Sequence, residues 1–409
     1  MRRVVVTGIG VVSAVGLTAT EFFDSLIQAR SGVGEITQIP TDALTVKVAA
    51  EVKGFDPSAH FAAKQMGLLD RFAQFALVAA REALADSGFS PTEAEADRFG
   101  VAMGTSFGGM VTLDAGYERL YGERSPRLHP LTIPRIMYNA AASQISMFFS
   151  ARGPILAIST ACASGAQAIG WAFHQIKYGY ADAMLAGGAD APITFGVMKA
   201  WEALRVLASG HGDPARACRP FSRDREGLVV GEGAAVLLLE EYERARARGA
   251  RMYAEIVGYG TSADASHITD PSVEGPARAM RAALAEAGLA PEAVTYINAH
   301  GTATKANDRI ETEAIKLVFG SHARRLAISS TKALHGHTMG AAGAIEFVAA
   351  LLALHHGIIP PTAHYTEPDP ECDLDYVPNC AREQKLEVVL SNSFAFGGIN
   401  AVLVARRVS

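Results

Sequence analysis

The chain has 409 residues, of which 49% are hydrophobic and 19% charged, with 39 glycines and 18 prolines. This composition supports a large apolar core and excludes a disordered chain, while the length exceeds the roughly 250–300 residues at which a single core stops growing. The formal net charge of −5 argues against a protein that binds nucleic acid over its whole surface.

Cysteine usage and hydropathy indicate in which cellular compartment the protein resides. No CxxC pair occurs among the four cysteines, Cys162, Cys218, Cys372 and Cys380, so neither a disulfide framework nor a zinc site is predicted. The longest candidate membrane segment, residues 344–359, is interrupted by Glu346 and two histidines, and no stretch reaches the roughly 18–20 apolar residues of a span. We expect a cytoplasmic protein with reduced thiols, bound neither to membrane nor to nucleic acid.

The order of predicted elements repeats along the chain. An apolar strand at residues 4–12 precedes an amphipathic helix that ends in the segment 81–91, and a strand at 100–105 follows. Residues 254–260, 281–291 and 296–302 repeat this order, with the second helix 200 residues after the first (281 − 81). We therefore predict two related α/β halves, residues 1–250 and 251–409, with mostly parallel sheets covered by helices.

Cys162 stands out as a candidate nucleophile. Residues 158–171 predict a buried strand that turns into a helix of small residues, with Cys162 at or near the helix N-terminus. Unpaired backbone N–H groups at that position lower a thiol pKa and stabilise an anion, and the small neighbours leave room for a substrate carbonyl. A free cysteine is more often a small buried hydrophobic residue, and we assign that role to the other three.

Two histidines belong to similar elements of the second half. His300 follows a predicted strand, where ligand chemistry collects in parallel sheets. His337 lies in the segment 329–343, a strand, a glycine-rich turn and a small-residue helix that mirror the element around Cys162. We predict that Cys162 and His337 face each other across a pseudo-two-fold axis, where neutral imidazoles donate hydrogen bonds to a carbonyl that becomes an enolate. His335 is the weaker candidate in its segment.

The whole chain resembles the elongating β-ketoacyl-[acyl carrier protein] synthases of the thiolase-like superfamily. Five motifs carry the resemblance in the family's order: residues 160–165, 231–234, 300–304, 332–337 and 391–398. The resemblance implies a thiolase-like α/β fold in which duplicated halves form five layers, α-β-α-β-α. It also implies a decarboxylative Claisen condensation of an acyl chain with malonyl-[acyl carrier protein], giving 3-oxoacyl-[acyl carrier protein], carbon dioxide and free carrier protein.

The resemblance assigns catalytic roles to individual residues. Cys162 accepts the acyl chain, His300 and His337 stabilise the enolate, and Lys332 pairs with Glu346 to organise the site, since an unpaired buried lysine is costly. Backbone N–H groups of Cys162 and Phe396 form the oxyanion hole, and Phe396 is also the gate between the two half-reactions.

Further positions match the family's binding sites. Thr302 and Thr304 match residues that hydrogen-bond the pantetheine arm, and Phe107 lines the acyl pocket. No cofactor is required, because phosphopantetheine arrives on the carrier protein. Five residues match a monovalent-cation site found in some relatives: Asn298, Ala299, Glu346, Ser391 and Asn392.

The sequence also departs from the family pattern. Ala395 and Ile399 replace the usual glycine and threonine beside the gate, so we expect altered gate mobility. Phe107 is larger than its usual counterpart, which predicts a shortened or redirected acyl pocket. Candidate cations for docking an acidic carrier protein are Lys64, Arg71, Arg127 and Arg135, while Gly210 stands where a relative carries arginine.

Pathway and assembly stay open at this point. Residues 190–194, 201–207 and 367–375 resemble the branch of specialised synthases that make nodulation-signal acyl chains or aryl polyenes. The family implies a homodimer, or a heterodimer with a chain-length partner. Two alternatives are a non-catalytic chain-length partner, which is expected to lack the cysteine, and a coenzyme A thiolase, which needs a second cysteine in a C-terminal Cys-x-Gly that Cys380 does not provide.

Overall fold

Ten strands form one continuous sheet in the computed structural model, which describes residues 1–409. From edge to edge they are β10 (Ala327–Ser329), β9 (Tyr296–Asn298), β13 (Val388–Ala395), β14 (Ile399–Arg406), β8 (Ala254–Ala263), β1 (Val4–Ser13), β7 (Gly233–Glu241), β6 (Ala183–Asp190), β4 (Phe99–Gly104) and β5 (Ile155–Ile158). The order is symmetric about the β1–β8 junction, where residues 4–6 lie opposite residues 254–256. This symmetry confirms the predicted duplication.

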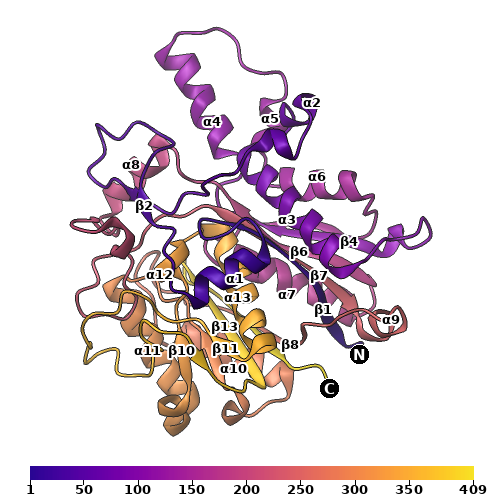
Figure 1. The fold of residues 1–409 in the computed structure, drawn as a ribbon, viewed down its shortest axis with the longest axis vertical. Helices are drawn as coiled ribbons and strands as arrows, with labels where there is room; N and C mark the ends of the chain where they lie inside the picture. Colours follow the sequence, from indigo (N-terminus) through magenta and orange to yellow (C-terminus); the bar gives the residue numbers. More distant parts are fainter.

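Five layers result from the way this sheet folds. The helices α7 (Ser164–Lys177) and α13 (Ala342–His356) contact each other and strands of both halves, so they form the central layer. The outer face of the first half is covered by α3 (Arg71–Ser87) and α6 (Ala140–Phe149), and that of the second by α10 (Glu274–Ala287) and α11 (Lys305–Phe319) (Figure 1). The predicted α-β-α-β-α thiolase-like arrangement is confirmed.

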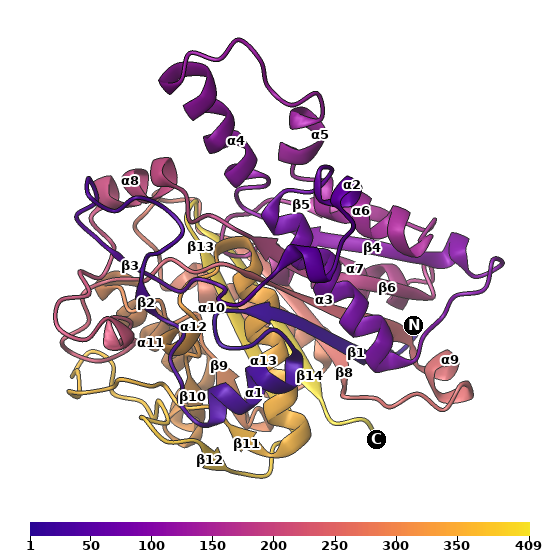
Figure 2. The same ribbon diagram turned by 45° about the horizontal axis from the view of Figure 1, so that its top comes forward.

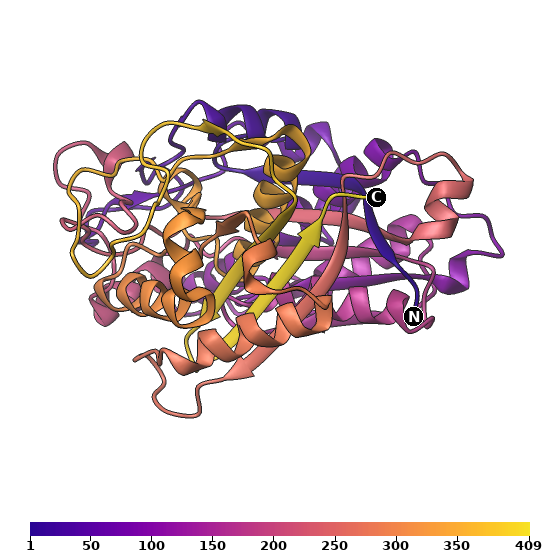
Figure 3. The ribbon, with the colours of Figure 1, turned by 90° about the horizontal axis from the view of Figure 1, so that it is seen from below.

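The remaining helices and strands lie outside the ten-stranded sheet and the six helices of the central and outer layers. They are α1 (Ala19–Ile27), α2 (Ala63–Met66), α4 (Met110–Tyr117), α5 (Thr132–Ile136), α8 (Phe195–Leu204), α9 (Tyr242–Ala247), α12 (Lys332–His335) and the two-stranded pairs β2 (Gly34–Glu35) with β3 (Val48–Ala49) and β11 (Ile358–Ile359) with β12 (Arg382–Glu383). The hairpin of α4 and α5 projects from the body (Figure 2). Both chain ends lie near the β1–β8 junction (Figure 3), where Arg3 contacts the carbonyl of Ser409.

Matched glycines explain how each half packs a long outer helix, α3 or α10, on its first strand. A Cβ atom at Gly10 of β1 would lie 1.9 Å from the carbonyl oxygen of Ala79 in α3, and one at Gly260 of β8 would lie 2.0 Å from that of Ala279 in α10. Only a residue without a side chain permits this approach of helix backbone to strand. The nearly equal distances in the two halves show that the repeat extends to the packing of helix backbone on strand backbone.

The sheet is mixed, so the expectation of mostly parallel sheets is wrong. Parallel pairing is confined to β5, β4 and β6 in one half and to β10, β9 and β13 in the other, whose strands are joined by crossovers. The strands β13 and β14 are joined by a tight turn and must run antiparallel. The pairs at the centre, β7 with β1 and β1 with β8, are also antiparallel.

Contrary to the expectation that no stretch reaches the length of a span, one helical stretch, Met339–His356, is apolar and long enough to cross a membrane by length and composition. In the structure 89% of that stretch is buried, because it is the central helix between the two half-sheets. Buried core helices pass the same hydropathy test, and the position of this one identifies it as a core helix.

The close approach at Gly260 gives a stability prediction. We expect Gly260→Ala to lower the free energy of unfolding by about 1–3 kcal/mol or more, because the new methyl group overlaps the Ala279 carbonyl. Urea denaturation followed by circular dichroism measures the change. The control is Gly122→Ala at an exposed helical position, where a Cβ atom would make only an ordinary contact, 3.7 Å from Glu118 Cγ, and the free energy should stay constant or rise by up to about 1 kcal/mol. Equal effects of the two substitutions would refute this packing explanation.

Candidate active site

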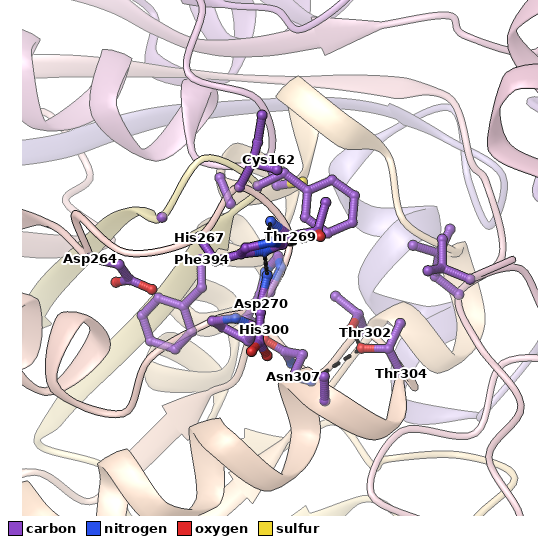
Figure 4. A pocket seen from close by; sticks show the side chains of 18 of the residues that line it. Cys162, Asp264, His267, Thr269, Asp270, His300, Thr302, Thr304, Asn307 and Phe394 are labelled. Atoms are coloured by element: carbon purple, nitrogen blue, oxygen red, sulfur yellow. Dashed lines mark hydrogen bonds between the residues drawn. The ribbon is translucent and has the colours of Figure 1, made fainter. Parts of the chain in front are cut away.

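Cys162 lies in the turn between β5 and α7, as predicted. The preceding residue, Ala161, has a left-handed backbone conformation with φ of 48°. The Ser164 hydroxyl fixes the turn, since it accepts a hydrogen bond from the Thr160 N–H (2.8 Å) and donates one to the Ala161 carbonyl (2.6 Å). Cys162 is buried but borders a cavity (Figure 4).

Both predicted histidines reach the cysteine from the other half of the chain. His337, between α12 and α13, places Nε2 3.0 Å from Cys162 Sγ. His300 follows β9, and its ring stands edge-on to that of His337 with centroids 5.4 Å apart. One ligand-type atom from each of the three side chains lies within 4.8 Å of the others. The predicted meeting of nucleophile and histidines across the pseudo-two-fold axis is therefore found in the structure.

The contacts of the two rings fix the side on which each carries its proton. Nδ1 of His337 accepts a hydrogen bond from the Met339 N–H (3.2 Å), and Nδ1 of His300 lies 3.3 Å from the ammonium group of Lys332. A neutral imidazole that accepts at Nδ1 carries its hydrogen on Nε2. Both Nε2 atoms are therefore donors, which suits a developing oxyanion and does not suit a divalent metal, for which Nε2 must offer a lone pair.

Lys332 and Glu346 form the predicted ion pair, and both side chains are fully buried. The Lys332 ammonium also donates to the His300 carbonyl oxygen at 2.6 Å. Burial raises the pKa of the Glu346 carboxyl to about 7, and the neighbouring ammonium group opposes that rise. The pair connects the His300 loop to α13 in the central layer.

Burial is the main influence on the protonation of Cys162, His300 and His337. It lowers the pKa of His300 and of His337 well below the usual value, and the positive charge of Lys332 lowers both further. Burial also raises the pKa of the Cys162 thiol to about 12, although Lys332 and the backbone N–H groups of Cys162 and Phe396 act in the opposite direction. The predicted lowering of the thiol pKa is wrong for the free enzyme, because desolvation exceeds the effect of the helix N-terminus.

Two cavities meet at Cys162. One is lined by His300, His337, Thr302, Thr304 and Phe396 among others, and the Thr302 and Thr304 hydroxyls are hydrogen-bonded at 2.9 Å (Figure 4). The other is mainly apolar and is lined by Ser106, Phe107, Ser159, Ala161, Cys162, Val197, Ala200, Trp201, Leu204, Met339 and Phe396. Every residue predicted to bind substrate thus lines one of the two cavities.

Phe396 lies between these cavities, in the turn from β13 to β14. Its ring packs on Trp201 with centroids 6.0 Å apart. The two following glycines, Gly397 and Gly398, have left-handed φ angles of 84° and 69°, a conformation that side chains other than glycine rarely adopt. The turn is also tied to the loop before α10, since the Gly397 N–H donates to the Ile268 carbonyl at 2.7 Å.

The five residues predicted for a cation are brought together on neighbouring strands and α13. Asn298 in β9 lies opposite Ser391 in β13, and all five residues are buried. The side-chain oxygens of Asn298, Ser391 and Asn392 have no hydrogen-bond partner, although both amide nitrogens do. Unpaired buried oxygens on β9 and β13, the strands on which α13 with Glu346 packs, are a donor set that fits a hard cation.

Two carboxylates at the site were missed by sequence reasoning. Glu311 in α11 accepts hydrogen bonds from the N–H groups of His300 and Gly301, both at 2.8 Å, and so holds the histidine loop. Asp190 ends β6 and binds backbone on both sides of the apolar cavity. No catalytic motif marks either residue, and the segment 190–194 was noted only for its resemblance to the specialised branch; the one structural signal was that Asp190 lies at the C-terminal end of a strand.

Other candidates have structural roles or separate locations. His335 is buried between the Thr331 hydroxyl and the Gly336 carbonyl, which explains its place outside the site. Cys218 and Cys372 are buried as expected, but the prediction of a buried hydrophobic role is wrong for Cys380, which is exposed. Neither cavity that contains Cys162 is lined by Cys380. Gly210 has a φ of 69°, and a Cβ atom there would lie 2.4 Å from Val48, so arginine does not fit.

The docking cations differ in accessibility. Lys64 and Arg127 are exposed, and Arg135 is half-buried. The prediction for Arg71 is wrong, because its guanidinium binds both oxygens of Glu232 at 2.7 and 2.8 Å. That partner is 161 residues away in the sequence.

Comparison with known proteins identifies the family in which this arrangement of cysteine and histidines occurs. The model of the β-ketoacyl synthase N-terminal domain matches residues 1–245, and that of the C-terminal domain matches residues 253–366. The chain belongs to the β-ketoacyl synthase family. It is an enzyme that condenses an acyl group with malonyl-[acyl carrier protein] to a 3-oxoacyl product.

Relatives and solved structures agree with this membership. Nodulation protein E of Rhizobium sp. (strain N33) is 50% identical over 407 residues that cover 100% of both chains, and 3-oxoacyl-[acyl-carrier-protein] synthase 2 of Coxiella burnetii is 44% identical over 100% of this chain and 99% of its own. A β-ketoacyl synthase from Burkholderia phymatum shares 39% identity and a TM-score of 0.93, with 100% of both chains covered.

Two further solved structures contain ketosynthases in assemblies. In each comparison the match covers 100% of this chain and 100% of the other chain. One is a type II polyketide acyl-carrier protein in complex with its ketosynthase bound to the hexaketide, with 35% identity and a TM-score of 0.92. The other is the ishigamide ketosynthase/chain length factor, with 37% identity and a TM-score of 0.91.

The raised thiol pKa predicts how alkylation of the free enzyme depends on pH. Below a pKa of about 12 the thiolate fraction rises about tenfold per pH unit, so the iodoacetamide rate constant at Cys162 should rise about tenfold per unit from pH 7 to 9. Peptide mass spectrometry separates this reaction from that of exposed Cys380, and Cys162→Ser is the blank. A plateau near pH 7 would show instead that the helix N-terminus dominates.

Proposed function

We propose that Cys162 carries the acyl chain between the two half-reactions. In the first, its sulfur attacks the thioester carbonyl of an acyl-carrier protein, a C–S bond to Cys162 forms, and the bond to the pantetheine sulfur breaks. The proton lost by Cys162 leaves with the carrier thiol. The proposal rests above all on the 3.0 Å contact between Cys162 Sγ and His337 Nε2, because this N–H and the backbone N–H groups of Cys162 and Phe396 stabilise the thiolate and the oxyanion.

The histidines then serve the second half-reaction. Malonyl-carrier protein loses carbon dioxide, and the resulting enolate oxygen accepts hydrogen bonds from Nε2–H of His300 and His337. The enolate carbon attacks the acyl carbonyl, the C–S bond to Cys162 breaks, and the released thiolate takes up one proton from solvent. Both imidazoles stay neutral at neutral pH, since burial and Lys332 lower their pKa values, so they act here as hydrogen-bond donors rather than as cations.

We assign the two cavities to the two parts of the substrate. The cavity with Thr302 and Thr304 takes the pantetheine arm, because its polar hydroxyls suit the amides of that arm. The apolar cavity beside Phe107 takes the acyl chain. Phe396 lines both and separates them, which supports its assignment as the gate.

The partners follow from this assignment. An acidic acyl carrier protein delivers the phosphopantetheine, with exposed Lys64 and Arg127 as docking cations. The enzyme works as a homodimer or with a chain-length partner, and the ishigamide assembly supports the second arrangement. Retention of Cys162 and both histidines makes this chain the catalytic member of such a pair.

We further propose a specialised biosynthetic role in the cytoplasm. Similarity to nodulation protein E at 50% identity, against 44% to 3-oxoacyl-[acyl-carrier-protein] synthase 2, supports a specialised acyl product over housekeeping fatty acids. Four cysteines without a disulfide bond are consistent with a reducing compartment. The five residues Asn298, Ala299, Glu346, Ser391 and Asn392 hold a monovalent cation that binds their otherwise unpaired buried oxygens.

Replacing Cys162 separates condensation from malonyl decarboxylation. We expect Cys162→Gln to abolish condensation and to leave malonyl decarboxylation in place, because His300 and His337 remain. Product mass spectrometry and carbon dioxide release measure the two activities. Incubation of the unsubstituted enzyme with acyl-carrier protein should add one acyl group to the peptide that contains Cys162.

Two results would contradict the proposed function. One is condensation that persists in Cys162→Gln, since the nucleophile would then lie elsewhere. The other is an unsubstituted enzyme that forms no acyl adduct at Cys162.

Phe107 predicts substrate selectivity. We expect kcat/KM for long saturated acyl-carrier proteins to be at least about tenfold below that for short ones, because the ring stands in the apolar cavity. Phe107→Ala should reduce this difference. Equal turnover of long and short saturated chains by the unsubstituted enzyme would contradict the assignment of Phe107.

A further inference from the structure

Asp190 is a buried carboxylate that touches both sides of the apolar cavity without lining it. It is fully inaccessible at the end of β6. Its oxygens accept four hydrogen bonds: from the Thr105 hydroxyl (2.5 Å) and the N–H groups of Ser106 (2.9 Å), Phe107 (3.1 Å) and Gly340 (2.7 Å). All four donors are neutral, so the charge is stabilised by backbone and hydroxyl dipoles alone.

These donors belong to two segments from opposite halves of the chain. The segment after β4 carries Phe107, and the segment before α13 carries Met339, and both side chains line the apolar cavity. Met339 has a left-handed φ of 51°. A Cβ atom at the next residue, Gly340, would lie 2.4 Å from the Ser106 nitrogen, so the two segments are in direct backbone contact at Asp190.

The second segment also leads to the catalytic histidine. The N–H group of Met339 donates to Nδ1 of His337, and this contact directs the Nε2 hydrogen toward Cys162 Sγ, 3.0 Å away. Asp190 binds the adjacent N–H group, that of Gly340. One carboxylate therefore holds the backbone that positions a wall of the acyl cavity and the backbone that orients the proton of His337.

A carboxylate suits this junction better than any uncharged side chain of its size. Each oxygen receives two donors: Thr105 and Phe107 on Oδ1, Ser106 and Gly340 on Oδ2. An ionised carboxylate accepts at both oxygens, whereas an amide presents an NH₂ group at one of them. In either orientation, asparagine would set two donors against an NH₂ group and lose two of the four hydrogen bonds.

We propose that Asp190 is the positioning residue that sets the acyl-chain selectivity of the enzyme, by fixing Phe107 and Met339 against each other across the two halves. It touches neither substrate nor sulfur and acts through these two side chains. The inference rests on the proposed function, because it takes the apolar cavity as the acyl site.

The experiment compares Asp190→Asn with the same kind of change at a half-buried carboxylate elsewhere in the fold, Glu82→Gln. Glu82 also accepts two backbone N–H hydrogen bonds, from Val11 and Ala19, but lies in α3 away from both cavities. The readout is the ratio of kcat/KM for a short and a long saturated acyl-carrier protein, together with the midpoint of thermal unfolding. We expect Asp190→Asn to change the ratio by about tenfold or more, and Glu82→Gln to lower the unfolding midpoint with the ratio unchanged.

A milder variant keeps the proposal testable if Asp190→Asn does not fold. Thr105→Val removes one donor and leaves three backbone donors in place, and it should shift the ratio in the same direction by a smaller factor. An unchanged ratio in Thr105→Val and in folded Asp190→Asn would overturn the proposal and leave Asp190 a structural residue. Absence of condensation by the unsubstituted enzyme would instead refute the proposed function.

Discussion

The buried ammonium group of Lys332 is the charge on which the active site depends. It has no access to water, and its partners are the Glu346 carboxylate and the His300 carbonyl and Nδ1. Removing either member of such a pair leaves an unpaired buried charge, which typically costs about 3–5 kcal/mol. The same positive charge reinforces the effect of burial on the histidines and lowers their pKa values. A single ion pair thus holds the His300 loop on the central helix, and its ammonium group adds to the burial that keeps both rings neutral.

The duplicated fold supplies the geometry around this charge. Each half contributes one strand, turn and helix of small residues, and the two central helices α7 and α13 bring these turns together between the half-sheets. Small residues are needed here because backbone approaches backbone: a Cβ atom at Gly165 in α7 would lie 2.9 Å from the Gly340 carbonyl. Cys162 and His337 meet as a consequence of this packing, and Asp190 spans the same junction with hydrogen bonds to both halves.

The sequence was sufficient to predict features that local pattern determines. The matched helices end at Gly88 and Gly288 in the left-handed conformation, and Cys162, His300 and His337 stand in turns that glycine and small residues mark. Features that depend on distant partners were not predictable. From the sequence alone Arg71 is indistinguishable from a free docking cation, because its ion pair with Glu232 forms only in the folded chain. Glu311 likewise binds the His300 N–H group only once the His300 loop has folded over α11. The direction of the Cys162 pKa shift depends on the depth of burial, which no motif encodes.

The proton positions of the two active-site histidines test the central claim most directly. In a sample labelled with ¹⁵N at histidine, assigned by comparison with His300→Ala and His337→Ala, nitrogen chemical shifts distinguish the Nε2–H tautomer from the Nδ1–H tautomer and from imidazolium. We predict neutral Nε2–H rings for both residues from pH 8 down to pH 6, about the usual histidine pKa. An imidazolium signal, or an Nδ1–H tautomer at either residue in that range, would contradict the role given to Lys332 and to the Met339 hydrogen bond.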